Sequence, residues 1–378
     1  MRRLATAALA TAALTLSATI ALPAATQAAP KVVASIKPIH SLVAAVMGEE
    51  GAPELIVKGA GSPHAYSLKP SEAHAIAQAD LVFWVGDGLE TFLDKPLESL
   101  PEKARIVTLS DVEGLTLYPM REGGAWERHS HAGEAHDHDG HDHEAGHDGH
   151  DHEAGHDHDH EADHDHEAEH DHDHEHDHAE AHDEHGHDEH GHDHHGHDEH
   201  AHDGTDPHIW LDPVNAALMA DAIAGALAKA DPDNAETYAA NADALKASLA
   251  SLQEKVADEL EPVRARPYIV FHDGYQYFER RFGLDAVGSV TISPEQRPGA
   301  QRLTEIRAKL AETGAVCVFA EPQFEPSLVR TVVEGTETRT GTLDPLGAAI
   351  PEGPQAYGAL LETMAHDLVA CLEPSATE

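Results

Sequence analysis

The chain has 378 residues, a formal net charge of −45 at pH 7 and only two cysteines. Such an acidic chain is poorly suited to bind nucleic acid or an anionic membrane surface. The charge is unevenly spread, because 29 of the 35 histidines and 27 of the 69 acidic residues lie between positions 129 and 202. That tract contains no Lys or Arg, and the remaining chain carries 42 acidic against 24 basic residues, a net charge of −18.

The first 28 residues contain two arginines, an apolar middle rich in Ala and Leu, and an end of small residues. This order predicts a secretory signal peptide that is cleaved after Ala28. The apolar middle is too rich in alanine to serve as a membrane anchor. No cysteine precedes Cys317, so no lipid-attachment cysteine stands at the cleavage site. We therefore expect an exported, periplasmic protein that is not membrane-anchored.

Strand-like apolar segments follow at residues 32–36, 54–57, 81–86 and 104–110, and helical segments separate them. One of these helices begins near His40. Strands that alternate with helices at this spacing predict a parallel sheet with right-handed crossovers. We assign residues 29–230, with the histidine-rich tract inserted among them, to an N-terminal lobe.

The tract at 129–202 contains no apolar residue larger than alanine. It has nothing to bury in a core, so we expect it to be disordered. Imidazole binds Zn, Cu and Ni, and interleaved carboxylates raise the local cation concentration. A solvated spacer has no need of imidazole, so we interpret the tract as an accessory metal-binding loop. Its candidate ligands are His136, His138, His141, His143, His156, His158, His160, His172, His174 and His176.

Beyond the tract, residues 231–262 predict one long helix with a single apolar stripe. A second alternation follows, with strands at 268–273, 284–290, 315–321 and 340–345 and a closing helix at 355–372. We assign residues 263–378 to a C-terminal lobe. The predicted fold class is therefore α/β, with two lobes that each contain a parallel four-stranded sheet flanked by helices.

Only six histidines lie outside the tract, namely His40, His64, His74, His208, His272 and His366. Parallel sheets gather their ligand sites at the carboxyl ends of the strands. His64 lies in a Gly/Ser/Pro loop after the second strand, and His272 ends the strand at 268–273. His208 follows the tract, and Asp344 ends the last strand. We interpret these four as the candidate metal site and the other three histidines as structural or surface residues.

Five motifs, GAGSPHAYSLKPSE, DPHIWLDP, FHDGYQYFERRFGL, EPQF and GTLDPLG, occur in this order along the chain. With the histidine-rich insert, they resemble the zinc-specific periplasmic solute-binding proteins of bacterial ABC uptake transporters, of the metal-binding cluster A-I family. The resemblance implies two lobes joined by one rigid helix, with Zn²⁺ bound in the cleft between them. It also implies a monomer, without enzymatic activity, that serves a membrane permease and a separate ATPase subunit.

The same resemblance implies that His64, His208 and His272 are the zinc ligands. Manganese members of the family place a carboxylate at the position of His272, and a nitrogen-rich set favours zinc. In some zinc members a glutamate precedes the first histidine, whereas Pro63 stands there in this chain. The fourth ligand is expected to be Asp344 or a water, and tetrahedral zinc accepts either.

An even pair of cysteines in an exported protein favours a disulfide, here between Cys317 and Cys371. Such a bond would tie the third strand of the second lobe to the closing helix, which also agrees with the family. A Cys-based metal site is the alternative, but the two residues lack C-x-x-C spacing. Glu321 could be a carboxylate of the cleft, but a structural role at a strand end is the preferred interpretation. Arg280 and Arg281 are interpreted as a solvent-facing pair on a helix.

Two other functions compete with zinc delivery. Three histidines and an open position would also suit a zinc hydrolase, but no H-E-x-x-H motif or evident general base accompanies them. A metal buffer or surface adhesin would make the tract the whole function, but the histidines of the two lobes would then have no role.

The sequence has no P-loop motif, so the energy for import must come from another subunit. The tract is expected to collect zinc or sense it.

Overall fold

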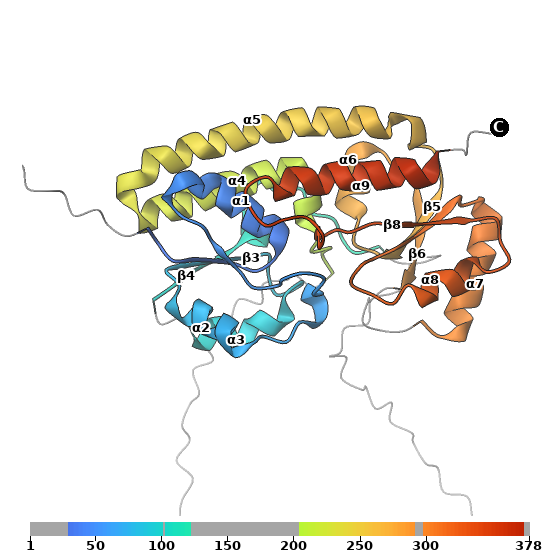
Figure 1. Ribbon diagram of the computed structural model, residues 1–378, viewed down its shortest axis with the longest axis horizontal. Coiled ribbons are helices and arrows are strands. Elements are labelled where there is room, and N and C mark those ends of the chain that lie inside the picture. Colours follow the sequence, from blue (N-terminus) through green and yellow to red (C-terminus); the bar gives the residue numbers. More distant parts are fainter. Residues whose placement is uncertain (1–28, 101–102, 122–203, 292–297, 374–378) are drawn as a thin grey trace, which may run out of the picture. The chain divides into compact units, whose positions relative to one another are not determined.

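The computed structural model describes residues 29–100, 103–121, 204–291 and 298–373 (Figure 1). The predicted signal peptide and the histidine-rich tract, with its ten candidate ligands, lie outside these ranges. Both predicted lobes fall within them. The predictions for the strands, the long helix and the four candidate site residues can therefore be compared with the structure.

The first lobe, called here the N-lobe, is built on a four-stranded parallel sheet with the order β2-β1-β3-β4. Each strand falls inside a predicted segment and is shorter than it. Helices α1 and α4 lie on one face of this sheet, and α2 and α3 on the other (Figure 1). The elements are β1 (Val32–Ala34), α1 (Lys37–Met47), β2 (Glu54–Leu55), α2 (Pro70–Gln78), β3 (Leu81–Trp84), α3 (Asp94–Ser99), β4 (Arg105–Thr108) and α4 (Pro213–Ala230).

The second lobe, the C-lobe, repeats the arrangement with the order β6-β5-β7-β8, again all parallel. Its four strands lie at the predicted positions to within a few residues. Figure 1 shows α7 and α8 flanking this sheet. The elements are β5 (Tyr268–His272), α6 (Gln276–Phe282), β6 (Ala286–Thr291), α7 (Ala300–Thr313), β7 (Cys317–Ala320), α8 (Ser327–Val333), β8 (Arg339–Thr342) and α9 (Ala356–Leu372).

The two lobes are joined by one long helix, α5 (Ala235–Leu260), of 26 residues. At 1.5 Å per residue it is about 39 Å long. The predicted apolar stripe is confirmed, because its residues recur every three or four positions and face the core: six are buried, and Leu245 is partly buried between Ala242 and Leu249. The six are Tyr238, Ala242, Leu249, Leu252, Val256 and Leu260. The helix packs against α1, α4 and α9. The exact lobe limits at 230 and 263 stay a prediction.

One continuous hydrophobic core runs through both lobes, from β1 and β3 across α1, α4, α5 and α9 to β5. The side chains of β5 alternate between this core and a second cluster beside α7. Tyr268 and Val270 enter the shared core, whereas Ile269 and Phe271 enter the second cluster. Because alternate strand residues share a face, His272 is expected on the side of Tyr268 and Val270. That is the side on which the two lobes meet.

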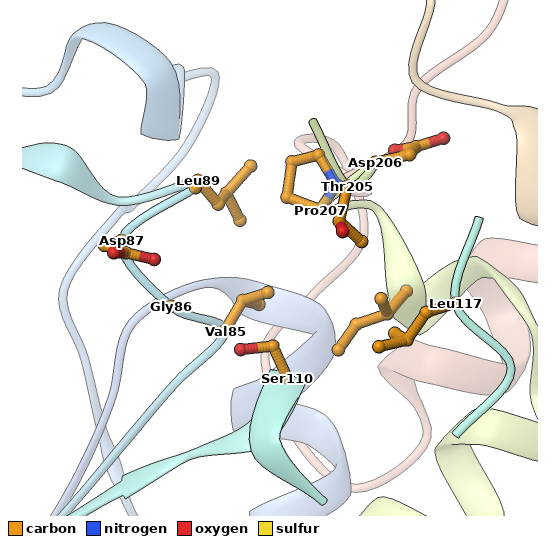
Figure 2. Close-up of a pocket in the computed structure, with 11 residues that line it drawn as sticks. Val85, Gly86, Asp87, Leu89, Ser110, Leu117, Thr205, Asp206 and Pro207 are labelled. Atoms are coloured by element: carbon orange, nitrogen blue, oxygen red, sulfur yellow. The ribbon is translucent and has the colours of Figure 1, made fainter. Parts of the chain in front are cut away.

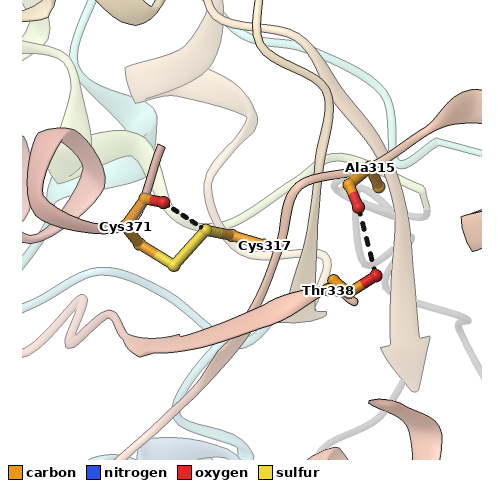
Figure 3. Close-up of a disulfide and its surroundings, with 4 residues drawn as sticks. All are labelled: Ala315, Cys317, Thr338 and Cys371. Carbon is orange, nitrogen blue, oxygen red and sulfur yellow. Dashed lines mark hydrogen bonds between the residues drawn. A yellow bond between two sulfur atoms is a disulfide. The ribbon is translucent and has the colours of Figure 1, made fainter. Parts of the chain in front are cut away.

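The predicted disulfide is present between Cys317 of β7 and Cys371 of α9 (Figure 3). The two residues are 54 positions apart in the sequence. A cross-link over a loop of this length stabilises a fold by about 4 kcal/mol in the chain-entropy account. It fixes the closing helix to the centre of the C-lobe sheet. Next to it, the Thr338 hydroxyl donates a hydrogen bond to the carbonyl oxygen of Ala315 (Figure 3).

The chain segments on either side of residues 122–203 lie side by side. Pro119 and Thr205 form an isolated antiparallel bridge, and a backbone hydrogen bond flanks the bridge on each side. Helix α6 supports this bridge, because Gln276 Nε2 donates a hydrogen bond to the Pro119 carbonyl at 3.0 Å. The described segments that end at residue 121 and resume at residue 204 therefore meet at one place, next to helix α6 of the C-lobe.

Candidate metal centre

Three of the predicted site residues, His64, His208 and His272, come together between the lobes. One ring nitrogen of each lies within 4.8 Å of the others, and among the described residues this is the one such group of three potential ligands. His64 belongs to a 3₁₀ turn after β2, His208 precedes the turn that leads into α4, and His272 ends β5. The two lobes thus supply the group jointly.

His208 is buried and is held by a neighbouring carboxylate. Its Nδ1 lies 2.8 Å from Asp206 Oδ1, and Gln276 of α6 donates a hydrogen bond to Asp206 Oδ2 at 3.2 Å. Burial alone would raise the pKa of Asp206, but its hydrogen bonds and charge interaction with His208 outweigh burial and lower that pKa. Asp206 is therefore an ionised acceptor, which makes His208 Nδ1 the protonated nitrogen of its ring.

His272 has an equivalent partner in Glu321, which directly follows β7. Its Nδ1 lies 2.6 Å from Glu321 Oε1, and its backbone amide donates to the same oxygen at 3.3 Å. Burial lowers the pKa of His272, but attraction to the Glu321 carboxylate outweighs burial, and the net effect is a raised pKa. Glu321 was interpreted as structural from the sequence. Its place at the carboxyl end of the strand beside β5 was the signal that could have identified it.

These two carboxylates leave the opposite nitrogens of both rings facing each other. The two Nε2 atoms are 3.1 Å apart, and a proton on one of them joins them in a hydrogen bond. A metal ion bound by both nitrogens would take the place of that proton. The pKa of His64 is lowered well below its usual value, by burial and then by the neighbouring His208 and His272, so His64 is neutral at pH 7. The donor set suits Zn²⁺.

Gly274, two residues after His272, makes room at this point. A Cβ atom at Gly274 would lie 2.4 Å from His272 Nε2 and 2.9 Å from His208 Nε2. Both distances are shorter than van der Waals contact, so a side chain there would displace the two rings. Nothing in the sequence marked Gly274 as part of the site, because a glycine in a loop carries no chemical signal of its own.

Asp344 does not join the group of three ligands. Its Oδ1 accepts hydrogen bonds from Gln323 Nε2 and from the backbone amides of Leu346 and Gly347, and its Oδ2 accepts one from Ala348. The carboxylate thus organises its own loop. Its role as the fourth ligand stays a prediction, and to bind the ion Asp344 would have to exchange some of these bonds.

A pocket surrounds the three histidines, and much of its wall is apolar. Trp210, Phe324, Pro345 and Leu346 contribute to it together with Pro63. Trp210 is fully buried, and its indole Nε1 donates to the carbonyl oxygen of Pro345 at 2.9 Å, which links the N-lobe to the C-lobe loop. Apolar walls lower the local dielectric and strengthen the attraction between an ion and its ligands.

The helix α6 fastens the C-lobe to the N-lobe beside this pocket. Arg281 donates to both carboxylate oxygens of Asp212, the residue that caps α4, and the guanidinium of Arg280 stacks 4.4 Å from the ring centroid of Tyr118. Arg280 is exposed, as expected, whereas Arg281 is partly covered, because its ion pair with Asp212 leaves its side chain 27% exposed. The sequence could not show that this part of α6 lies beside Asp212.

A second ionic contact lies at the same interface. Arg121 forms ion pairs with Asp273, the residue after His272, and with Glu279 of α6. Burial raises the pKa of Glu279 to about 7, against the opposing effect of Arg121. The segment that precedes residue 122 is therefore bound to the residue next to a candidate ligand.

A second pocket lies at the carboxyl ends of β3 and β4 in the N-lobe (Figure 2). Leu89 and Pro207 point toward each other across it, and the Asp206 carboxylate points away (Figure 2). Val85 and Leu117 add to its apolar lining, and no histidine contributes. This pocket therefore offers no set of nitrogen ligands.

The other three histidines outside the tract do not belong to the group formed by His64, His208 and His272. His40 is buried in α1, with Nε2 3.1 Å from the Pro53 carbonyl oxygen. His74 on α2 is exposed, and His366 on α9 is 75% exposed, with Nδ1 3.9 Å from Glu259. This agrees with their interpretation as structural or surface residues.

Comparison with known proteins agrees with this geometry. The sequence profile of a family described as "Zinc-uptake complex component A periplasmic" (ZnuA) matches residues 32–371. The chain belongs to this family. The family match covers both lobes and all three candidate histidine ligands.

Two relatives within the ZnuA family are similar along nearly their whole length. Both are described as a high-affinity zinc uptake system protein ZnuA. The one from Brucella abortus (strain 2308) is 49% identical over 341 residues, covering 90% of this chain and 91% of the relative. The one from Paracoccus denitrificans (strain Pd 1222) is 40% identical over 355 residues, covering 94% and 95%.

A solved structure described as the crystal structure of ZnuA has the same fold. Its TM-score is 0.63 at 21% identity, and the match covers 91% of this chain and all of that one. The ZnuA-type fold of two parallel sheets flanked by helices and joined by a long helix is thereby confirmed. None of the helices in the described ranges combines the length and apolar character needed to cross a membrane.

Proposed function

We propose that this chain binds Zn²⁺ between its lobes through His64, His208 and His272 and delivers the ion to the membrane permease of an ABC importer. The observation that carries the proposal is the pair of Nε2 atoms 3.1 Å apart, with His64 completing a group within 4.8 Å. Zinc is the transported substrate. Membership of the zinc-uptake family supports this choice of cargo.

The geometry favours capture over catalysis. In a zinc hydrolase a carboxylate or imidazole commonly acts as general base on a metal-bound water. The carboxylates beside the ligands, those of Asp206 and Glu321, each use one oxygen to contact a histidine Nδ1, whereas the second oxygen of Glu321 is buried without a hydrogen-bond partner. Such partners orient the rings and raise their basicity, which increases metal affinity. We therefore propose a binding function without enzymatic activity.

The remaining features of the proposal follow the family. The protein acts in the periplasm as a monomer, after removal of residues 1–28, and an ATPase subunit behind the permease supplies the energy. Asp344 is the proposed fourth ligand and a water the alternative. The tract at 129–202 collects zinc or senses it, and the ten loop histidines named above are its proposed ligands.

The test is a competitive zinc titration with a fluorescent chelator on a mature protein that lacks residues 129–202. We expect one tight site, which His64→Ala abolishes. His74→Ala is the matched control, because His74 is exposed on α2 and should leave the affinity unchanged. If the deletion leaves only weak binding, the ion is held by the tract and the assignment to the three histidines is wrong.

A further inference from the structure

Lys37 is the one buried lysine among the described residues, and it connects the two lobes. It is the first residue of α1 in the N-lobe, and Ser35 and Ile36 separate it from β1. Its Nζ donates hydrogen bonds to the carbonyl oxygens of Gly347, Ala348 and Ile350, at 2.6, 2.9 and 2.8 Å. All three donors of the ammonium group are thereby used by one C-lobe loop.

That loop, residues 344–350, forms part of the pocket around the three histidines. Its first residues, Pro345 and Leu346, line the pocket. Asp344 binds backbone amides of the loop, whereas Lys37 binds backbone carbonyls of the same turn. The peptide groups of the loop thus lie between the Asp344 carboxylate and the Lys37 ammonium group. Their amides point to the anion and their carbonyl oxygens to the cation, so both interactions are attractive.

Gly347 allows this arrangement. Its φ of +66° lies in the left-handed region, and its carbonyl accepts from both Lys37 Nζ and the Ile350 amide. Trp210 provides a second bond from the N-lobe to this loop, at Pro345. The C-lobe wall of the pocket is therefore fastened to the N-lobe at two points.

We propose that Lys37 is a positioning residue for ion retention, which holds loop 344–350 against the N-lobe and so keeps the metal pocket closed. The inference rests on the proposed function. Lys37 does not touch the ion, and it acts through the loop alone. Without its cation the wall formed by Pro345 and Leu346 would open more often, and a bound ion would escape faster.

The experiment uses the mature protein without residues 129–202, loaded with one equivalent of zinc. Stopped flow measures the rate at which this protein loses zinc to excess chelator. Lys37→Met keeps the aliphatic stem but removes the charge and the donors. We expect zinc loss about tenfold faster, comparable with other residues that act through a metal ligand's surroundings. Lys255→Met, which removes an exposed lysine between α5 and α9, is the control and should leave the rate unchanged.

A double-mutant cycle separates this role from general destabilisation. Lys37→Met should add little to Trp210→Phe, because both residues anchor the same loop. It should remain additive with Glu321→Gln, which acts through His272. Additivity in both cycles, or an unchanged rate in Lys37→Met, would overturn the inference.

Two further outcomes are distinguishable. If Lys37→Met does not fold, Trp210→Phe removes the other bond to this loop, and it should also accelerate zinc loss if the inference is correct. An unchanged rate in Trp210→Phe would then contradict it. If the unsubstituted deletion protein binds no zinc tightly, the proposed function itself fails, whatever the variants do.

Discussion

The two sheets share one strand order but use the same position differently. In the N-lobe, Ser35 directly follows β1, and its hydroxyl donates to Glu90 Oε1 at 2.5 Å. In the C-lobe, His272 ends β5, and its Nδ1 contacts Glu321. Each sheet thus places a buried glutamate, from the segment after its third strand, beside the end of its first strand. This is the point where the strand order reverses, at which ligands commonly bind.

The difference lies in the side chain that the glutamate meets. Glu90 also accepts hydrogen bonds from the amides of Val85 and Gly86, so its contacts stay within the N-lobe. A serine hydroxyl has no second atom to offer beyond the carboxylate. Histidine has a second nitrogen on the far side of its ring, and there it meets His208. The topology therefore places a polar pair in both lobes, and in the C-lobe the second imidazole nitrogen joins the candidate metal site.

The largest expected effect comes from making the C-lobe pair resemble the N-lobe pair. His272→Ser should weaken zinc binding on the order of 1000-fold, because losing a ligand should exceed the 10–100-fold cost of losing a partner of a ligand. Competition with a chelator measures this. Ser35→Ala is the counterpart and should leave zinc affinity unchanged. Tight binding retained in His272→Ser would show that this ring is not a ligand.

A second prediction concerns the N-lobe pair and pH. Burial raises the pKa of Glu90 from 4.5 to about 7, despite hydrogen bonds from Ser35 and two amides. Between these values the folded protein holds a proton that the unfolded chain has lost. The stabilisation is therefore complete below pH 4.5 and is lost as the pH rises through 7. A shift of this size corresponds to about 3 kcal/mol.

Urea unfolding of the wild type and Glu90→Gln between pH 5 and 8 measures this effect. The glutamine variant stays neutral, so its free energy of unfolding should fall less as the pH rises. Identical slopes in the two proteins would contradict a raised pKa at Glu90. Zinc should be absent from these measurements, because its own binding changes with pH.

The smallest expected effect on zinc affinity comes from Glu321, whose carboxylate contacts the candidate ligand His272. Glu321→Gln keeps the shape of the side chain but removes the charge that supports His272. Zinc affinity should fall about tenfold, the lower end for such partners of ligands. Glu90→Gln provides the matched control in the other lobe and should leave zinc affinity unchanged. Equal losses in both variants would mean that the two pairs do not differ in function.

Much of this organisation could be predicted from the sequence. Short apolar segments located all eight strands, and the spacing from Tyr238 to Leu260 located the long helix, because periodicity reflects burial along one element. His64, His208 and His272 were recognisable because they are three of only six histidines outside the tract and the motifs around them match a family. Patterns of these kinds depend on residues that are close in the sequence, so they can be read without knowing which elements pack together.

The missing parts depend on which elements meet. Glu321 contacts His272 only because β5 and β7 are neighbours, and Arg281 reaches Asp212 only because α6 lies against the N-lobe. Gly274 matters for the volume that it leaves empty beside two rings. Asp344 lies after the last strand, close to the position predicted for it, but its carboxylate oxygens accept hydrogen bonds from the backbone amides of its own loop. Pairings over 49 or 69 residues leave no periodic trace in a sequence.

The bridge between Pro119 and Thr205 has a consequence for how this protein can evolve. Because the bridge and α6 hold Pro119 and Thr205 beside each other, a segment of any length between them begins and ends at one place of the described fold. Doubling a closed loop costs only about 0.6 kcal/mol in chain entropy. The bridge is thus a position at which inserted segments can be lengthened, shortened or exchanged while the fold of the two lobes stays the same.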